Sequence, residues 1–325
     1  MNSSVNWRPT ATIQTLKKRA EINTQIREFF AHRNVLEVET PVLAHASVTD
    51  IHLQGFCTQF NSPLKPETES LFLQTSPEFA MKRLLCAGSG SIFQLCKSFR
   101  NEESGKHHNP EFTMLEWYRV DFNSSQLIDE IDELLQKILK TDPLDRHTYQ
   151  QAFLTYCDID PLNCTLKDLK RKAEYFGFAN IAQHETSKDV LLQLLCSQVV
   201  EPKIGRVKPV AITDFPASQA ALARIKQDDP RVAERFEIYF KGLELANGYY
   251  ELSDVKEQLS RFKNDNQVRQ QSGLTEIGLD EHFMAAMENG LPDCSGVALG
   301  VDRLVMIACE VQNIDQVMSF SIDNA

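Results

Sequence analysis

The stretch SFRNEESGKHHNPEFTMLEWY, residues 98–118, constrains the fold most, because it predicts two strands joined by a polar loop. Phe112, Met114, Glu116 and Tyr118 alternate along its second half, which places them on one face of a return strand. The loop between the strands, ESGKHHNP, contains the Gly, Asn and Pro residues that favour turns. The stretch therefore predicts a β-hairpin with one partly polar face.

Arg100 and Glu102 lie two residues apart near the end of the first strand. If Phe99 and Asn101 face a core, both charged side chains project from the opposite face and form a polar wall. A guanidinium held in this way offers planar donors to phosphate or carboxylate oxygens, and a neighbouring glutamate can orient it or accept from an amine. A solvated hairpin with an ordinary ion pair explains the same residues equally well.

Helices and strands are mixed along the rest of the chain. Residues 14–33 predict an amphipathic helix that ends near Asn34, and VLEVETP predicts a strand that stops at Pro41 at a sheet edge. The segment 123–140 predicts the clearest helix, with one apolar stripe behind a Ser/Asn cap. RFEIYF predicts a strand, and Asp254 with Glu257 predicts the start of a further helix.

This order shows no regular βαβ alternation, which favours an α+β fold with a mainly antiparallel β-sheet flanked by helices. Residues from about 145 to 230 contain helical patterns separated by prolines and predict a helical insertion between two halves of one core. We therefore expect one domain over residues 1–325.

Composition excludes several classes of protein. The chain has 325 residues, 42% hydrophobic and 24% charged, and no apolar run or leader that predicts a membrane span or secretion, so we expect a cytoplasmic protein. The net charge of -11 argues against a non-specific nucleic-acid binder. The eight cysteines form no Cys-x-x-Cys pair, which predicts neither a zinc site nor a disulfide framework.

A second stretch, GLELANGYYELSD, contains two carboxylates seven residues apart, Glu244 and Glu251. An uninterrupted strand would point them to opposite faces, whereas a β-bulge at Asn247-Gly248 would bring them to one face. Converging carboxylates supply the oxygen ligands that Mg²⁺ requires. Two unrelated surface glutamates are the alternative interpretation.

A third stretch, CSGVALGVDRLVM, places Gly296 and Gly300 inside an apolar strand. Such glycines allow a ligand to approach bare backbone. Arg303 follows where a helix is predicted to begin, and its guanidinium can stack on a nucleobase. A glycine-tolerant turn into a helix is the alternative.

Together these stretches resemble motifs 2 and 3 of the class II aminoacyl-tRNA synthetases. The predicted helix and strand that end at Pro41 resemble motif 1, the dimer interface of that family. Within the family the chain is most similar to lysyl-tRNA synthetases, on the strings FRNE, HNPEFTMLEWY and NGYYEL. The resemblance covers nearly the whole chain.

The resemblance implies an ATP-dependent enzyme that adenylates an amino acid, in which Mg²⁺ helps to bind the phosphates. It implies that Glu244 and Glu251 hold the metal and that Arg100, Glu102 and Arg303 act in catalysis. The ATP-binding residues that it implies are Arg100, Glu102, Asn109, Phe112, Glu244, Leu245, Gly300 and Arg303. The implied substrate-binding residues, which would hold a diamine amino acid, are Ser76, Pro77, Glu78, Glu116, Tyr118, Glu251 and Ala298.

Three departures separate the chain from complete lysyl enzymes. We expect no N-terminal anticodon-binding OB domain, because the predicted motif 1 helix starts by about residue 14. Ala298 stands where lysyl enzymes have glycine, and Ser253 where they usually have asparagine. A methyl group in an amino-acid pocket changes selectivity by ~1–3 kcal/mol, so we hypothesise that Ala298 helps to exclude α-lysine.

A lysyl-like catalytic core with these departures resembles a branch of lysyl-tRNA synthetase paralogues that modify elongation factor P. That resemblance implies activation of (R)-β-lysine and its transfer to a lysine side chain of elongation factor P, by a homodimer without membrane association or stable tRNA binding. Two alternatives remain: a minimal enzyme that charges tRNA with lysine, and a catalytically silent regulatory subunit. The intact residues of all three motifs argue against the second.

Overall fold

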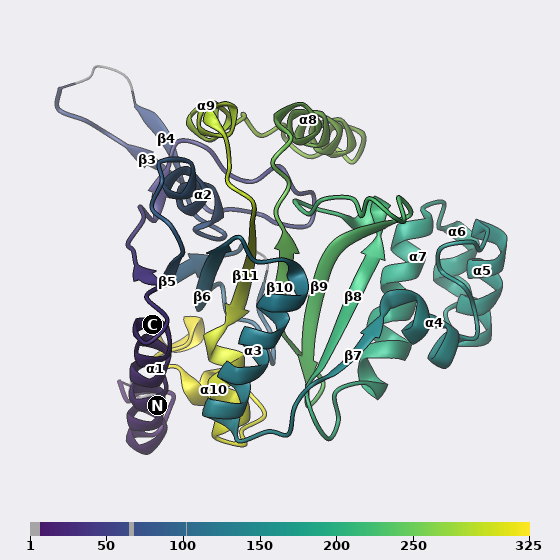
Figure 1. Ribbon diagram of the computed structural model, residues 1–325, viewed down its shortest axis with the longest axis horizontal. Helices are drawn as coiled ribbons and strands as arrows, with labels where there is room; N and C mark the ends of the chain where they lie inside the picture. The colour runs from purple at the N-terminus through teal and green to yellow at the C-terminus, as the bar shows by residue number, and fades with distance from the viewer. Residues whose placement is uncertain (1–6, 65–67, 102) are drawn as a thin grey trace, which may run out of the picture. The chain divides into compact units, whose positions relative to one another are not determined.

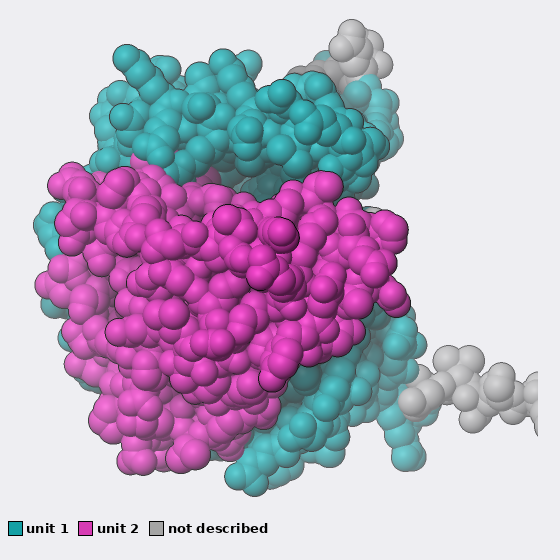
Figure 2. Space-filling model, turned by 90° about the vertical axis from the view of Figure 1, so that its right-hand side faces the viewer, with its two compact units in different colours: residues 1–121, 253–293, 298–325 teal, residues 122–252, 294–297 magenta. Residues whose placement is uncertain are grey.

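A computed structural model describes residues 7–64, 68–101 and 103–325 of the chain (Figure 1). The chain forms two compact units (Figure 2): unit 1 comprises residues 1–121, 253–293 and 298–325, and unit 2 comprises residues 122–252 and 294–297. Strand β11, Cys294–Gly300, contributes residues to both. No helix among the described residues has the length and hydropathy needed to cross a membrane.

Unit 1 contains the predicted hairpin. Strands β5, Ile92–Phe99, and β6, Glu111–Val120, pair antiparallel from Ile92 opposite Tyr118 to Phe99 opposite Glu111, which confirms it. Strand β5 ends before Arg100, and Asn101 is exposed, so the condition under which Arg100 and Glu102 would form one polar wall, with Phe99 and Asn101 facing a core, is not met at Asn101. Glu102 lies outside the described residues.

The predicted N-terminal helix is confirmed as α1, Ile13–Ala31, which begins after Thr12 and buries Ile22, Ile26, Phe29 and Phe30. The strand that should follow is shorter than predicted, because only β1, Leu36–Glu37, pairs in parallel with β5. The amide of Val38 still donates to the carbonyl of Phe93 at 2.9 Å, but the ladder ends there. The prediction of an edge strand is confirmed, since β1 stands at the end of the strand order.

The other described residues of unit 1 include a small sheet and four α-helices. The sheet is antiparallel, in the order β2-β4-β3. These elements are β2, Leu43–Ala44; β3, Cys57–Phe60; β4, Glu69–Leu73; α2, Glu78–Cys86; α8, Val255–Gln271; α9, Glu281–Asn289; and α10, Val301–Ala308. Asp254 caps α8 as predicted, by accepting from the Glu257 amide. The rings of Phe79 on α2 and Phe283 on α9 stack with their centroids 4.4 Å apart.

Unit 2 has a sheet in the order β10-β9-β8-β7, in which only the β7–β8 pair is parallel. Its strands are β7, Asp145–Thr148; β8, Val210–Pro216; β9, Val232–Phe240; and β10, Leu243–Tyr250. Helix α3, Ser124–Leu139, packs on β9 and β10 and buries the predicted apolar stripe behind a capping box of Asn123 and Gln126. The sequence prediction for this helix and for the strand RFEIYF is confirmed.

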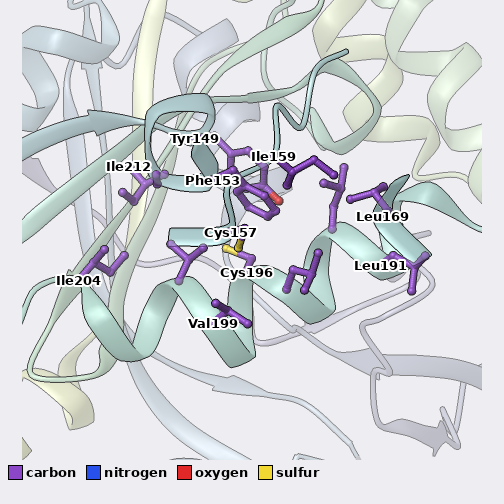
Figure 3. Close-up of a cluster of buried hydrophobic side chains, with 14 of the residues drawn as sticks. Tyr149, Phe153, Cys157, Ile159, Leu169, Leu191, Cys196, Val199, Ile204 and Ile212 are labelled. Carbon is purple, nitrogen blue, oxygen red and sulfur yellow. The ribbon is translucent and has the colours of Figure 1, made fainter. Parts of the chain in front are cut away.

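Helices gather beside β7 and β8 in unit 2, over the stretch for which an insertion was predicted (Figure 1). They are α4, Tyr149–Cys157; α5, Leu166–Tyr175; α6, Ala179–His184; and α7, Lys188–Leu195. Short helical turns occupy Cys196–Val200, Glu201–Lys203, Ala217–Gln219, Ile314–Val317 and Ile322–Asn324. Figure 3 shows the core of this region, where Phe153, Leu169 and Leu191 are fully buried together with Ile212 from β8. The predicted limits of the insertion stay a prediction.

All eight cysteines lie within the described residues, and none of them forms a disulfide.

Strand β10 contains a β-bulge, but the predicted position of this bulge is wrong. The register between β9 and β10 shifts between Glu244 and Ala246, whereas Asn247 and Gly248 pair regularly with β9. Gly248 has a different role, because it permits close packing. A Cβ atom at this position would overlap the ring of Phe236 and would lie 2.8 Å from the carbonyl oxygen of Gly296.

We therefore expect Gly248→Ala to lower the free energy of unfolding by about 1–3 kcal/mol, because an added methyl group must displace backbone or a buried ring. Gly278→Ala is the matched control, since no heavy atom lies within 4 Å of the place that its added methyl group would occupy. Chemical denaturation of both variants measures the difference. Equal destabilisation of the two variants would contradict this account of Gly248.

Candidate functional site

A polar cluster forms in unit 1 where α2 meets β6. The hydroxyl of Ser76 accepts from the amide of Glu78 at 3.0 Å, and it also hydrogen-bonds the Glu116 carboxyl. The Tyr118 hydroxyl donates to Glu116 Oε1 at 2.7 Å. Pro77 is buried between Ser76 and the first turn of α2. The structure thus brings together five residues that the sequence resemblance had grouped, from segments about 40 positions apart.

Glu116 has the most unusual electrostatics of this cluster. Its side chain is 2% exposed, and its Oε2 atom has no hydrogen-bond partner among the described residues. Burial, together with the nearby negative charge of Glu78, raises the pKa of Glu116 to about 8. Hydrogen bonds from Tyr118 and Ser76 oppose this rise in pKa. A buried carboxyl with an unused acceptor oxygen is suited to bind a cationic group that brings its own hydrogens.

Sequence reasoning missed Lys82, which belongs to the same cluster. Its side chain is 0% exposed, and its Nζ atom donates to Glu78 Oε1 at 2.6 Å. The spacing of four residues on a helix was a usable signal, because side chains at i and i+4 meet on one face. The sequence did not indicate that Lys82 is buried, because glutamate and lysine residues four positions apart are also common on exposed helix surfaces.

Arg100 lies beside the predicted nucleotide-binding aromatic residue. Its Cζ atom is 5.1 Å from the centroid of the Phe112 ring, and its guanidinium lies 3.6 Å from the Glu103 carboxylate. Its Nε atom donates to the carbonyl of Thr75 at 3.5 Å, one residue before Ser76. The guanidinium is therefore positioned next to the cluster that contains Glu116.

Arg303 lies on the first turn of α10, as predicted. Its Nη2 atom lies 2.7 Å from the Nε2 atom of His108, and its Nε atom donates to the carbonyl of His107 at 3.4 Å. Desolvation lowers the pKa of His108, and the positive charges of Arg303 and Arg100 lower it further. Both arginines thus act on one histidine of the hairpin loop, which supports the prediction that they share a site.

An ion pair between the partly buried Arg19 and the buried Asp302 ties the start of α10 to α1. Asp302 is 2% exposed; its Oδ1 accepts from Arg19 of α1 at 2.5 Å and its Oδ2 accepts from the amide of Thr113 on β6 at 2.6 Å. Arg19 also donates to the Thr113 hydroxyl at 2.7 Å. Sequence reasoning did not single out Asp302 or Arg19, because their partners lie far away in the chain.

The remaining predicted residues of unit 1 have mixed placements. Asn109 is buried; it donates to the carbonyl of Glu111 at 2.7 Å and accepts from the amide of Ile322 at 3.0 Å. Its side chain therefore stabilises the hairpin loop, and its contact with a nucleotide stays a prediction. Gly300 precedes α10, with the aliphatic part of Arg303 next to it, and Ala298 lies half-buried on β11.

In unit 2 the bulge places the two late carboxylates on the same side of the sheet. Glu244 pairs with Tyr239, and Asn247 and Tyr249 pair with the next residues of β9 on that face. Glu251 is the first residue after β10. If side chains continue to alternate between the two faces, Glu251 lies on the same face as Glu244, and it is 1% exposed. The bulged residue, Leu245, is buried. The predicted convergence of Glu244 and Glu251 is thus geometrically consistent, although the bulge lies at Leu245.

Two carboxylates of this kind fit a magnesium ion that keeps water and phosphate oxygens as its other ligands. Within the described ranges no group of three or more His, Cys, Asp or Glu side chains is arranged to hold a metal. A metal bound only through protein ligands is not expected from such a donor set.

The predicted site residues are divided between the two units. Glu244, Leu245 and Glu251 belong to unit 2. The other described site residues belong to unit 1: Ser76, Pro77, Glu78, Arg100, Asn109, Phe112, Glu116, Tyr118, Ala298, Gly300 and Arg303. The contacts of Ser76, Glu78 and Tyr118 around Glu116, and of Arg303 with His108, follow from the geometry, whereas their assembly with the other predicted residues and with the late carboxylates stays a prediction.

Comparison with known proteins gives the context of this geometry. Residues 2–324 match the family of tRNA synthetases class II (D, K and N). The chain is 55% identical over 323 residues to an elongation factor P--(R)-beta-lysine ligase of Haemophilus ducreyi, covering 99% of this chain and 98% of the relative. Proteins of the same name from Vibrio cholerae and Pseudoalteromonas translucida are 56% and 57% identical, and the alignments cover 98–99% of this chain and 99–100% of the relatives.

The pKa of Glu116 predicts a pH-dependent stability. Because the folded pKa, about 8, lies above the ordinary value of 4.5, the protonated carboxyl stabilises the fold, and this contribution is lost as the pH rises through about 8. Glu116→Gln remains neutral throughout. We expect the free energy of unfolding of the wild type, minus that of the variant, to fall from about pH 5 to about pH 8.5. Urea denaturation along a pH series measures it, and a constant difference would contradict the raised pKa.

Proposed function

This chain belongs to the class II tRNA synthetases (D, K and N), and we propose that it is an ATP-dependent ligase that modifies elongation factor P. It activates (R)-β-lysine as an adenylate and transfers the acyl group to a lysine side chain of elongation factor P. The observation that carries this proposal is the alignment, end to end, with ligases of that name. The buried Glu116 carboxyl beside Glu78 supports it, because a diamine substrate needs carboxylates for its ammonium groups.

Activation joins the amino acid to AMP. A carboxylate oxygen of β-lysine attacks the α-phosphorus of ATP, the bond from that phosphorus to the bridging oxygen breaks, and pyrophosphate leaves with the electron pair. In this proposal Arg100 stabilises the charge that grows on the α-phosphate oxygens and Arg303 supplies a second cation; the action of both arginines on His108 supports these roles. Phe112 provides an aromatic face next to Arg100 for the adenine.

Transfer then forms an amide. The neutral amine of the acceptor lysine attacks the carbonyl carbon of the adenylate, AMP leaves with the electron pair of the broken carbon–oxygen bond, and the amine loses a proton to solvent. Positioning and charge stabilisation supply the catalysis in both steps, so no nucleophilic side chain is required. The Glu116, Tyr118 and Ser76 cluster orients the substrate by holding an ammonium group at a fixed point.

Magnesium is part of this proposal. Glu244 and Glu251 would hold the ion, which neutralises phosphate charge when it is bound. The alternation that β10 continues from Glu244 to Glu251, just beyond its end, supports the assignment. We further propose a cytoplasmic homodimer that associates with neither membranes nor tRNA in a stable way, and the exposed apolar residue Leu36 on the motif 1 strand is consistent with a protein interface there.

We expect elongation factor P to gain one β-lysyl group when it is incubated with this protein, ATP, magnesium and (R)-β-lysine. Intact-mass spectrometry measures the addition, and Arg100→Ala should lower its rate at least about a hundredfold, because it removes charge stabilisation of the transition state. An unchanged mass of elongation factor P, together with efficient charging of tRNA with lysine in a filter assay, would support a minimal tRNA-charging enzyme instead. Absence of amino-acid-dependent pyrophosphate exchange would support a silent subunit.

Ala298 predicts substrate selectivity. Replacement by glycine removes one methyl group from the strand that floors the proposed amino-acid pocket, so we expect the preference for (R)-β-lysine over α-lysine to fall by about tenfold. Pyrophosphate exchange with each isomer measures the ratio of kcat/KM values. Ser253→Ala, which alters the other departing position, is the comparison variant. An unchanged isomer ratio in Ala298→Gly would show that this methyl group is not the cause.

A further inference from the structure

Lys82 is a charged side chain with no exposed surface, inside the cluster that surrounds Glu116. Taking an ammonium group out of water is costly, and it is tolerated in proteins only where a partner compensates it. Glu78 provides that partner, with Nζ and Oε1 at 2.6 Å, and the pair joins the first and second turns of α2. A solvated lysine would serve helix stability equally well, so burial at this point indicates a role within the cluster around Glu116.

The pair restrains Glu78. One carboxylate oxygen accepts from Lys82, while the amide of Glu78 donates to the Ser76 hydroxyl at 3.0 Å. The same Ser76 hydroxyl contacts the Glu116 carboxyl. Glu78 is therefore fixed at both its backbone and its side chain, and its charge is largely compensated before any substrate binds.

Glu116 differs from Glu78 in this respect. Tyr118 and Ser76 contact it, but its Oε2 atom is buried with no hydrogen-bond partner among the described residues. The titratable and charged groups that act on it are Glu78 and Lys82 from α2, Tyr118 from β6 and Cys96 from β5. Glu78 opposes ionisation of Glu116, whereas Lys82 favours it.

We propose that Lys82 is a positioning residue for amino-acid activation: it holds and neutralises Glu78, so that Glu116 Oε2 is the acceptor for one substrate ammonium. This inference rests on the proposed function. With Glu78 and Lys82 paired, the ionised cluster of Glu78, Lys82 and Glu116 in unit 1 carries a single net negative charge, which complements the single net positive charge of a diamino acid with two ammonium groups and one carboxylate. Substrate binding is accordingly coupled to loss of the proton from Glu116.

The test uses pyrophosphate exchange with the full-length protein at a series of pH values, for the wild type, Lys82→Met, Lys82→Arg and Glu78→Gln. KM is measured separately for (R)-β-lysine and for ATP. Circular dichroism and thermal unfolding identify variants that fail to fold. The double variant Lys82→Met/Glu78→Gln removes both charges, which avoids an uncompensated buried carboxylate if the single methionine variant is unstable.

We expect Lys82→Met to raise KM for (R)-β-lysine on the order of tenfold while KM for ATP is unchanged, because only the amino-acid pocket loses its positioning. The pH at which this KM falls should move upward in Lys82→Met, since a charge that favours ionised Glu116 is lost, and downward in Glu78→Gln, since an opposing charge is lost. Lys82→Arg should restore the wild-type pH profile. In the double variant KM should fall at a lower pH than in the wild type, because Glu78 has a larger effect than Lys82 on the pKa of Glu116.

A merely structural role for Lys82 predicts a different result, in which kcat and both KM values change together and the pH profile stays in place. That result in Lys82→Met, or a double variant with the wild-type profile, would overturn the inference. Failure of the proposed function is distinguishable, because the wild type itself would then show no exchange that depends on (R)-β-lysine.

Discussion

The ion pair between the partly buried Arg19 and the buried Asp302 links three elements of unit 1, namely α1, β6 and α10. Asp302 accepts hydrogen bonds from Arg19 of α1 and from the backbone of β6. Its neighbour on α10, Arg303, donates to the carbonyl of His107 in the hairpin loop. A buried carboxylate with two such partners is stable only if both remain in place, because an unpaired charge in this environment is costly. The helix that resembles the family's dimer interface and the helix that carries Arg303 are thus joined through one carboxyl group.

The local patterns of the sequence predicted the elements well. The hairpin of β5 and β6, helix α1 and helix α3 follow from apolar periodicity and capping residues, which act over a few positions. The limits of these elements were less accurate. The strand after Asn34 ends two residues after it starts, because a strand continues only while a neighbour offers partners.

The features that sequence reasoning missed depend on distant neighbours. The bulge falls at Leu245, whereas Gly248 packs closely against Phe236 of β9, a contact that the Asn-Gly pair itself does not indicate. The burial of Lys82 depends on what covers α2, which no local pattern records. The resemblance to known enzymes grouped Ser76, Glu78, Glu116 and Tyr118 correctly, but it gave no indication that Glu116 would have a raised pKa.

The core of the helical region in unit 2 limits which substitutions this part of the chain can tolerate. Tyr239 belongs to that core, and on β9 it stands opposite Glu244. Since close-packed interiors transmit strain, a change of volume among α4, α5 and α7 displaces the strand next to the proposed metal ligands. We therefore expect substitutions to be tolerated best on the outer faces of these helices, for example at the 79% exposed Tyr175.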